Sequence, residues 1–128
     1  MKVSKLTRAI EIIYGLILLI FGLNAFFMFM PGDVSAFSEK AANFMTALFE
    51  TGYMVPLLGV IFVLIGLSYI LNKYVSLGNI MLFPVMVNIL LFHIFLDFNG
   101  WWIALILVAL NIYMIKVYWK SYERIFDS

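Results

Sequence analysis

The chain of 128 residues contains no cysteine and only one histidine, His93. Without cysteine it can form no disulfide, offers no thiolate nucleophile and cannot ligate an iron–sulfur cluster. With one histidine it cannot ligate a haem through two histidines of its own, so a haem is not expected. The sequence also lacks a nucleophile–base pair, a glycine-rich phosphate loop and a cluster with the spacing of a metal site. It therefore favours neither a metal site nor an enzymatic activity of the chain on its own.

Charge is scarce as well. Charged residues make up 12% of the chain and hydrophobic residues 66%, whereas about 25% of the residues of a typical soluble domain are charged. The net charge of +1 gives no argument for binding nucleic acid. A soluble fold would have too little polar surface to cover its apolar core. We therefore predict an integral membrane protein whose main partner is the lipid bilayer.

Four long apolar stretches fill most of the chain. They are residues 9–30, 53–71, 77–96 and 101–117. A helix crosses the hydrocarbon core with about 20 apolar residues, and each stretch is close to that length. We therefore predict an all-α fold, an antiparallel four-helix bundle in the membrane, in which residues 1–128 form a single membrane domain.

Residues 35–50, between the first two spans, have the pattern of an amphipathic helix. The apolar positions, which recur at helical spacing, are Phe37, Ala41, Phe44 and Leu48. Ser35 or Asp33 is the expected N-cap. Beside a bilayer, such a helix is expected to lie flat on the outer interface or to cap the bundle.

Lysine and arginine are distributed unevenly. Seven of the eight fall in the two terminal segments and in the loop between the second and third spans, and only Lys40 lies in the first loop. Short segments rich in Lys and Arg stay cytoplasmic. The sequence therefore predicts that both termini are cytoplasmic, in the plasma (inner) membrane of a bacterium.

Small residues predict how the spans pack, because helices in lipid associate through close approach of their backbones. One seam, on the first span, consists of Glu11, Gly15, Gly22 and Ala25, and another, on the second, of Gly52, Gly59 and Gly66. We predict that these two spans pack together. Arg8 and Glu11, three residues apart, are expected to form a structural ion pair at the inner surface.

Polar residues within or beside the spans are the candidate ligand-binding residues, because each is costly in lipid unless it has a partner. They are His93, Asn88, Asp97 and Asn24. His93 lies about 6 Å inside the outer end of its span, and Asp97, one turn further on, could fix its tautomer for proton handling. The alternative is a helix-end pair that water and lipid headgroups satisfy. Asn88 and Asn111, near mid-membrane, are expected to hydrogen-bond between helices, with a ligand contact as the alternative.

The third span contains the pattern Pro84-x-x-x-Asn88-x-x-x-x-His93. Three further motifs accompany it: Thr51-Gly52-Tyr53-x-x-Pro56, Gly66-Leu67 and Trp119-x-x-x-Glu123-Arg124-x-Phe126. With these motifs the chain resembles, over essentially its whole length, the DoxX-like family of small four-helix membrane proteins. It departs from the family at the middle of the second span, where many members have a glutamate and this chain has Phe62 or Val63.

The resemblance implies a four-helix membrane fold. It also implies an association with quinone-linked oxidoreductases or other membrane redox complexes, or a role in protein trafficking. Two functions stay open. One is an accessory subunit of a redox complex that binds quinone or another apolar ligand near His93 and Asn88. The other is a non-enzymatic scaffold or chaperone that contacts other membrane proteins, with a homo-oligomer as a further possible assembly.

Overall fold

The structure, a computed structural model, describes residues 3–28 and 37–127. Every regular element within these ranges is a helix. The elements are α1 Lys5–Phe27, α2 Glu39–Glu50, α3 Met54–Leu71, α4 Val75–Phe95, α5 Trp101–Val117, the short 3-10 helix η2 Trp119–Ser121, and α6 Glu123–Phe126. The predicted all-α class is confirmed.

Three of these helices, α1, α3 and α4, are long and apolar enough to cross a membrane, and α5 is a shorter apolar helix of 17 residues. All four fall on the apolar stretches of the sequence. Helix α1 begins earlier than expected because Ser4 caps it, with its Oγ accepting a hydrogen bond from the backbone N–H of Thr7 at 3.1 Å. It ends at Phe27, where the left-handed backbone of the C-cap residue, Met28, closes the helix. The rest of the predicted first span, Phe29 and Met30, lies outside the described residues.

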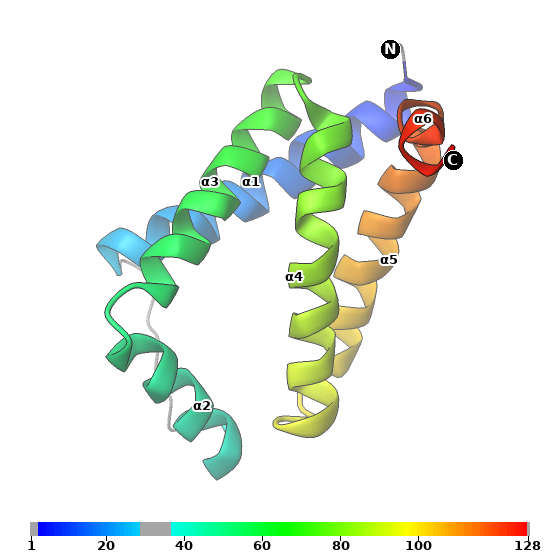
Figure 1. Ribbon diagram of the computed structural model, residues 1–128. Coiled ribbons are helices and arrows are strands. Elements are labelled where there is room, and N and C mark those ends of the chain that lie inside the picture. The colour runs from blue at the N-terminus through cyan, green and yellow to red at the C-terminus, as the bar shows by residue number, and fades with distance from the viewer. Residues whose placement is uncertain (1–2, 29–36, 128) are drawn as a thin grey trace.

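The apolar helices are arranged as two pairs, α1 with α3 and α4 with α5 (Figure 1). Glycines make the first pair close. A Cβ atom built on Gly15 would lie 2.8 Å from the carbonyl oxygen of Gly66, and one built on Gly22 would lie 2.9 Å from that of Gly59. The predicted packing of the first two spans is confirmed, with close approach at Gly15, Gly22, Gly59 and Gly66. Gly52, also predicted for the seam, precedes α3, and a Cβ built on it would have no neighbour within 4 Å.

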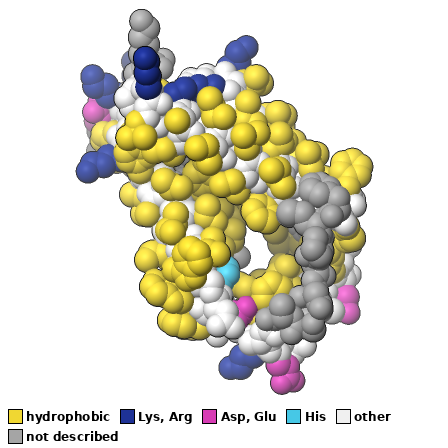
Figure 2. Space-filling view, turned by 180° about the vertical axis from the view of Figure 1, so that it is seen from behind, with side chains coloured by type: hydrophobic (Ala, Val, Ile, Leu, Met, Phe, Trp, Pro, Cys, Tyr) yellow, Lys and Arg dark blue, Asp and Glu magenta, His cyan; other side chains and the backbone are white. Residues whose placement is uncertain are grey.

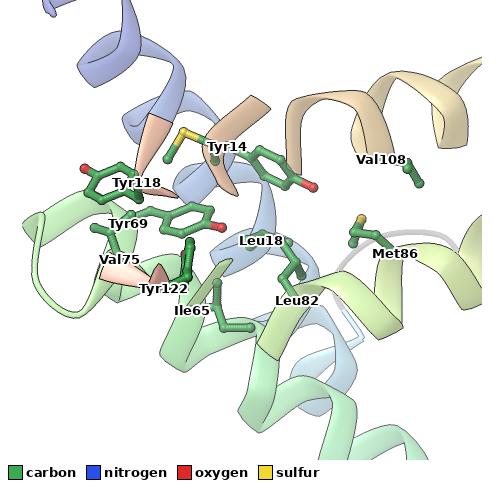
Figure 3. Packing of buried hydrophobic residues seen from close by; sticks show 11 residues of the cluster. Tyr14, Leu18, Ile65, Tyr69, Val75, Leu82, Met86, Val108, Tyr118 and Tyr122 are labelled. Carbon is green, nitrogen blue, oxygen red and sulfur yellow. The ribbon is translucent and has the colours of Figure 1, made fainter. Parts of the chain in front are cut away.

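The packed core occupies one end of the molecule. Its buried residues come from the middle of α1, the second half of α3, α4 from its start to its middle, the middle and end of α5, and the segment after α5 (Figure 3). They are Tyr14, Leu18, Ile65, Tyr69, Val75, Leu82, Met86, Val108, Met114, Tyr118 and Tyr122. We call this the terminal end, because α1 begins and α6 lies there (Figure 1). Towards the opposite end, no described apolar residue of α1 beyond Gly22, of α3 before Gly59 or of α4 beyond Met86 is fully buried.

Helix α2 lies at that opposite end. Its N-cap is Ser38, whose Oγ accepts a hydrogen bond from the backbone N–H of Ala41 at 3.2 Å. The expected caps, Ser35 and Asp33, lie outside the described residues, and the helix begins at Glu39 instead of Ser35. The apolar face predicted for this segment is used, because Phe37 and Phe44 both contact the ring of Phe92 on α4, with centroids 6.0 and 5.7 Å away. The Ser38 hydroxyl also donates to the carbonyl oxygen of Leu96. Helix α2 therefore links the start of α3 to the far end of α4.

Candidate functional site

A buried carboxylate lies at the centre of the terminal end. Glu11 of α1 is fully buried, and both of its carboxylate oxygens accept hydrogen bonds. Arg8 Nη1 donates to Oε2 at 2.8 Å, Asn72 Nδ2 donates to the same oxygen at 3.0 Å, and the Tyr118 hydroxyl donates to Oε1. A buried carboxylate is tolerated only when it is paired and hydrogen-bonded in this way.

Arg8 does more than neutralise Glu11. Its guanidinium also donates to the carbonyl oxygen of Tyr69, at 2.6 Å, and to that of Ile70. The last carbonyls of a helix have no partner within the helix and carry partial negative charge. The Arg8 guanidinium at the end of α3 therefore supplies these carbonyls with hydrogen-bond donors and with an opposite charge. The predicted ion pair between Arg8 and Glu11 is present. It also ties α1 to the end of α3 and, through Tyr118, to the segment after α5.

A second buried network crosses from α3 to α5. The Tyr69 hydroxyl donates to Asn79 Oδ1 at 2.6 Å, and Asn79 Nδ2 donates to the carbonyl oxygen of Met114 at 3.2 Å. Asn111 Nδ2 donates to the backbone oxygen of Asn79, also at 3.2 Å. The predicted interhelical hydrogen bond of Asn111 is therefore confirmed. Its Oδ1 is the one buried side-chain nitrogen or oxygen atom of the described residues without a hydrogen-bond partner.

Two tyrosines that follow α5 are buried, although their position at the inner end of the fourth span predicts aromatic side chains at the lipid interface. Tyr118 and Tyr122 are 3% and 2% exposed. Burial raises the pKa of Tyr118, and its hydrogen bond to the Glu11 carboxylate raises this pKa further. Burial also raises the pKa of Tyr122, whose hydroxyl donates to the carbonyl oxygen of Ser76 at 2.6 Å. Both phenols stay protonated, so both act as hydrogen-bond donors that hold the C-terminal segment against the core.

These hydrogen bonds hold the helices together at the terminal end. We call the residues whose side chains form them the lock: Arg8, Glu11, Tyr69, Asn72, Asn79, Asn111, Tyr118 and Tyr122. Glu11, Arg8, Asn72 and Tyr118 satisfy one another or helix ends, and no reactive group among them is left unengaged to act on a substrate. The described residues also contain no group of three His, Asp or Glu side chains that could hold a metal ion. The chemistry of a site must therefore be sought elsewhere in the described chain.

His93, the main residue predicted for a site, lies near the far end of α4. Its Nδ1 donates to the carbonyl oxygen of Ile89, one turn back on the same helix, at 2.9 Å. A carbonyl can only accept, so the proton is on Nδ1 and the other ring nitrogen, Nε2, is an acceptor in the neutral imidazole. The ring packs edge-on against Phe92, with centroids 5.2 Å apart, and its Nε2 faces Gly100 in the loop between α4 and α5.

The structure does not form the expected pair between His93 and Asp97. Helix α4 ends at Phe95, and the chain turns at Leu96. Asp97 is therefore not on the same helix face as His93, and no hydrogen bond or ion pair joins the two side chains. Asp97 is nevertheless buried, at 6% exposure. The tautomer of His93 is fixed by the backbone of Ile89, a local contact, in place of the predicted carboxylate.

The other two predicted site residues lie on different helix pairs. Asn88, on α4, is exposed and forms no hydrogen bond with another described residue, so its predicted interhelical bond is wrong. Asn24, on α1, is half-buried. Whether any of the four predicted residues contacts a ligand stays a prediction.

The two helix pairs leave a space between them at the end opposite the lock. Figure 2 shows a hollow there, with the histidine of the chain, in cyan, at its edge. The space follows from the position of the core, because the large buried side chains that pack the pairs together lie at the terminal end, and at the opposite end α2 contacts α4 through Phe37, Ser38 and Phe44. We call it the interpair hollow.

The sequence predicts both partners of only one contact of the lock, the ion pair between Arg8 and Glu11. Asn72 lies in the loop between the second and third predicted spans, Asn79 is the third residue of the third predicted span, and Tyr118 and Tyr122 follow the fourth. The sequence around each of these four residues predicts a position in a loop or at the membrane interface, not in a buried network. The available signal is that Glu11 is the one acidic residue within a predicted span, since a carboxylate in lipid requires partners on other helices.

Comparisons with protein-family models, with curated proteins and with solved structures find no match to this chain. The resemblance to the DoxX-like family therefore has no support beyond the residues that suggested it. The functional argument depends on the chain's own residues.

Proposed function

We propose that this is an integral membrane protein in which α1, α3, α4 and α5 all span the bilayer as a four-helix bundle with both termini cytoplasmic, in the plasma membrane of a bacterium. The length and apolar composition of α1, α3 and α4 support the membrane location, and α5 is apolar but shorter, with 17 residues. So does the position of the charges, because most of the Lys and Arg side chains in Figure 2 gather at the terminal end.

Single cysteines test this orientation cleanly, because the chain has none of its own. Thr46 on α2 and Ser121 after α5 are both exposed. In intact cells, a membrane-impermeant thiol reagent is expected to label the Thr46→Cys variant and not the Ser121→Cys variant, and permeabilised cells should label both. Labelling of Ser121→Cys alone in intact cells would invert the proposed orientation.

The same bundle provides a place for an apolar ligand, and we propose that it binds one in the interpair hollow, with a quinone as the leading candidate. The observation that carries the proposal is that the cluster of large buried side chains lies at the terminal end, while the opposite end buries, among the described residues, only the side chains of Ala41, Asp97 and Ala104. In a bilayer, the remaining space must be filled by something apolar, since water there would leave the surrounding side chains without contacts.

One polar group on α4, His93, could orient such a ligand, because its Nε2 can accept a hydrogen bond from a hydroxyl. Asn88 is exposed and lies about 140° around α4 from His93, so it faces away from the hollow. A quinone ring would also find aromatic neighbours in Phe92 and Phe44. A bound quinone would supply electron transfer, and the chain's own residues would supply binding and orientation. Membership of a redox complex stays a prediction.

The ligand can be tested in the purified protein. Organic extracts of the protein in mild detergent, analysed by ultraviolet absorption and mass spectrometry, are expected to contain a quinone in stoichiometric amount. The His93→Phe variant should retain about tenfold less, as expected for the loss of one hydrogen bond. Asn88→Leu, which changes an exposed residue on another face of the same helix, should retain the wild-type amount. Extracts without quinone, or equal retention in all variants, would contradict the proposal.

A second candidate function is a scaffold or chaperone for other membrane proteins. It is favoured by the large number of exposed apolar residues on both helix pairs, because a partner helix could fill the same hollow. Affinity purification from native membranes would separate the two candidates. A stoichiometric membrane protein without quinone supports the scaffold, and quinone without such a partner supports ligand binding.

A further inference from the structure

A second apolar feature, a groove, lies between α4, α5 and the C-terminal segment, close to the terminal end. Its volume is about 530 Å³, within the range of small-molecule sites. It is bordered by Ile80 and Phe83 of α4, Ile112 and Ile115 of α5, and Trp119 and Phe126 of the C-terminal segment. These residues leave almost no polar surface in the groove, so an occupant must be apolar where it contacts the protein.

The C-terminal segment builds one wall of this groove. The rings of Trp119 and Phe126 stack with centroids 5.7 Å apart and an angle of 9° between their planes. Tyr122 lies between them in the sequence, and its hydrogen bond to the carbonyl oxygen of Ser76 fixes the segment to the start of α4. The wall is therefore held in place by the core.

Three cations lie beside the groove. Lys116 is in the last turn of α5, Lys120 follows Trp119, and Arg124 precedes Phe126 by two residues. All three are exposed, and none forms an ion pair with another described residue. Glu123 and Asp127 in the same segment leave this region with a net positive charge of one.

We propose that this groove binds one acyl chain of an anionic phospholipid, with the phosphate held by Lys116 and Lys120. Lys116 lies one helical turn beyond Ile112 and next to Ile115, so the cations stand where the apolar groove ends. That is the arrangement of a lipid, in which the charged headgroup adjoins the chain. Basic pockets between membrane helices on the cytoplasmic side recognise anionic headgroups in this way. A free phosphate would have no use for the apolar groove.

Native mass spectrometry of the purified protein with added phosphatidylglycerol or phosphatidylcholine of identical chains tests the proposal. The anionic lipid is expected to bind roughly thirtyfold more tightly, from two lysines near the phosphate. The Lys116→Gln, Lys120→Gln double variant should bind both lipids with the lower affinity. The Ile112→Trp variant, which fills the groove, should lose both lipids.

Two controls keep the result specific. Ile106→Trp introduces the same side chain at an exposed position of α5 that does not line the groove, and Lys40→Gln removes a cation from α2 at the opposite end of the molecule. Both should bind lipid like the wild type. Equal affinity for the two lipids, or unchanged binding by Ile112→Trp relative to Ile106→Trp, would overturn the proposal. Because the lipid and the quinone occupy different surfaces, failure of one test leaves the other intact.

Discussion

Replacing Gly66 with alanine is expected to destabilise the protein by about 1–3 kcal/mol, the usual cost of overpacking a close contact. The added Cβ would lie 2.7 Å from the carbonyl oxygen of Gly15 and 2.9 Å from the backbone nitrogen of Leu19. Both are backbone atoms, so they cannot rotate away as a side chain can. Helices α1 and α3 must therefore separate. Thermal unfolding in detergent or nanodiscs measures the effect.

Gly78 of α4 provides a matched control for this substitution. A Cβ there would have its nearest neighbour, a Tyr69 ring carbon, at 3.4 Å, an ordinary contact. Alanine favours a helix over glycine by about 1 kcal/mol, so Gly78→Ala should leave stability unchanged or raise it slightly. If Gly66→Ala and Gly78→Ala behaved alike, close packing of α1 against α3 would not be what holds the first pair together.

Replacing Arg8 with glutamine is expected to have a larger effect, a loss of about 3–5 kcal/mol, because it leaves the buried Glu11 carboxylate without its counter-charge. The change also removes the donors to the carbonyl oxygens of Tyr69 and Ile70 at the end of α3. Denaturant titration or thermal unfolding would report it. Lys5→Gln is the control, since Lys5 is exposed one turn earlier and forms no ion pair within the described residues.

A double variant separates the effect of the unpaired charge on Glu11 from the effect of the changed side-chain shape at Arg8. In the Arg8→Gln, Glu11→Gln protein no uncompensated charge is buried, and the two amides can still hydrogen-bond. It should therefore be more stable than Arg8→Gln alone, which is the non-additivity that coupled residues show. Additive losses from the two substitutions would mean that Arg8 and Glu11 act independently.

The sequence predicts the helices and the first pair well, because both depend on local or regular patterns. The apolar stretches correspond to α1, α3, α4 and α5 with shifts of a few residues, and spacings of seven predict where Gly59 and Gly66 lie. The ion pair of Arg8 and Glu11 was predictable for the same reason, since three residues on a helix bring two side chains together.

The remaining contacts depend on tertiary structure. Nothing local in the sequence indicates that Tyr118 bonds Glu11, 107 residues earlier. The expected pair of His93 and Asp97 assumed a helix that continues through residue 97, but α4 ends at Phe95. Asn88 and Asn111 both lie near the middle of an apolar span, so the sequence gives no reason to distinguish them. The packing of α4 and α5 leaves Asn88 exposed and Asn111 buried.

We propose that the lock closes one end of the molecule and that a ligand fills the hollow between the helix pairs beyond it. Spin labels on introduced cysteines test it most directly, in nanodiscs, by pulsed electron paramagnetic resonance. Leu6 and Lys116 are exposed positions near the lock, and Leu57 and Leu91 are exposed positions on the two pairs beyond it. The Leu6–Lys116 distance should have a narrow distribution that added quinone does not change. The Leu57–Leu91 distance should be broadly distributed without quinone and become narrower when it is added. A Leu57–Leu91 distribution that is equally narrow with and without quinone would contradict the account.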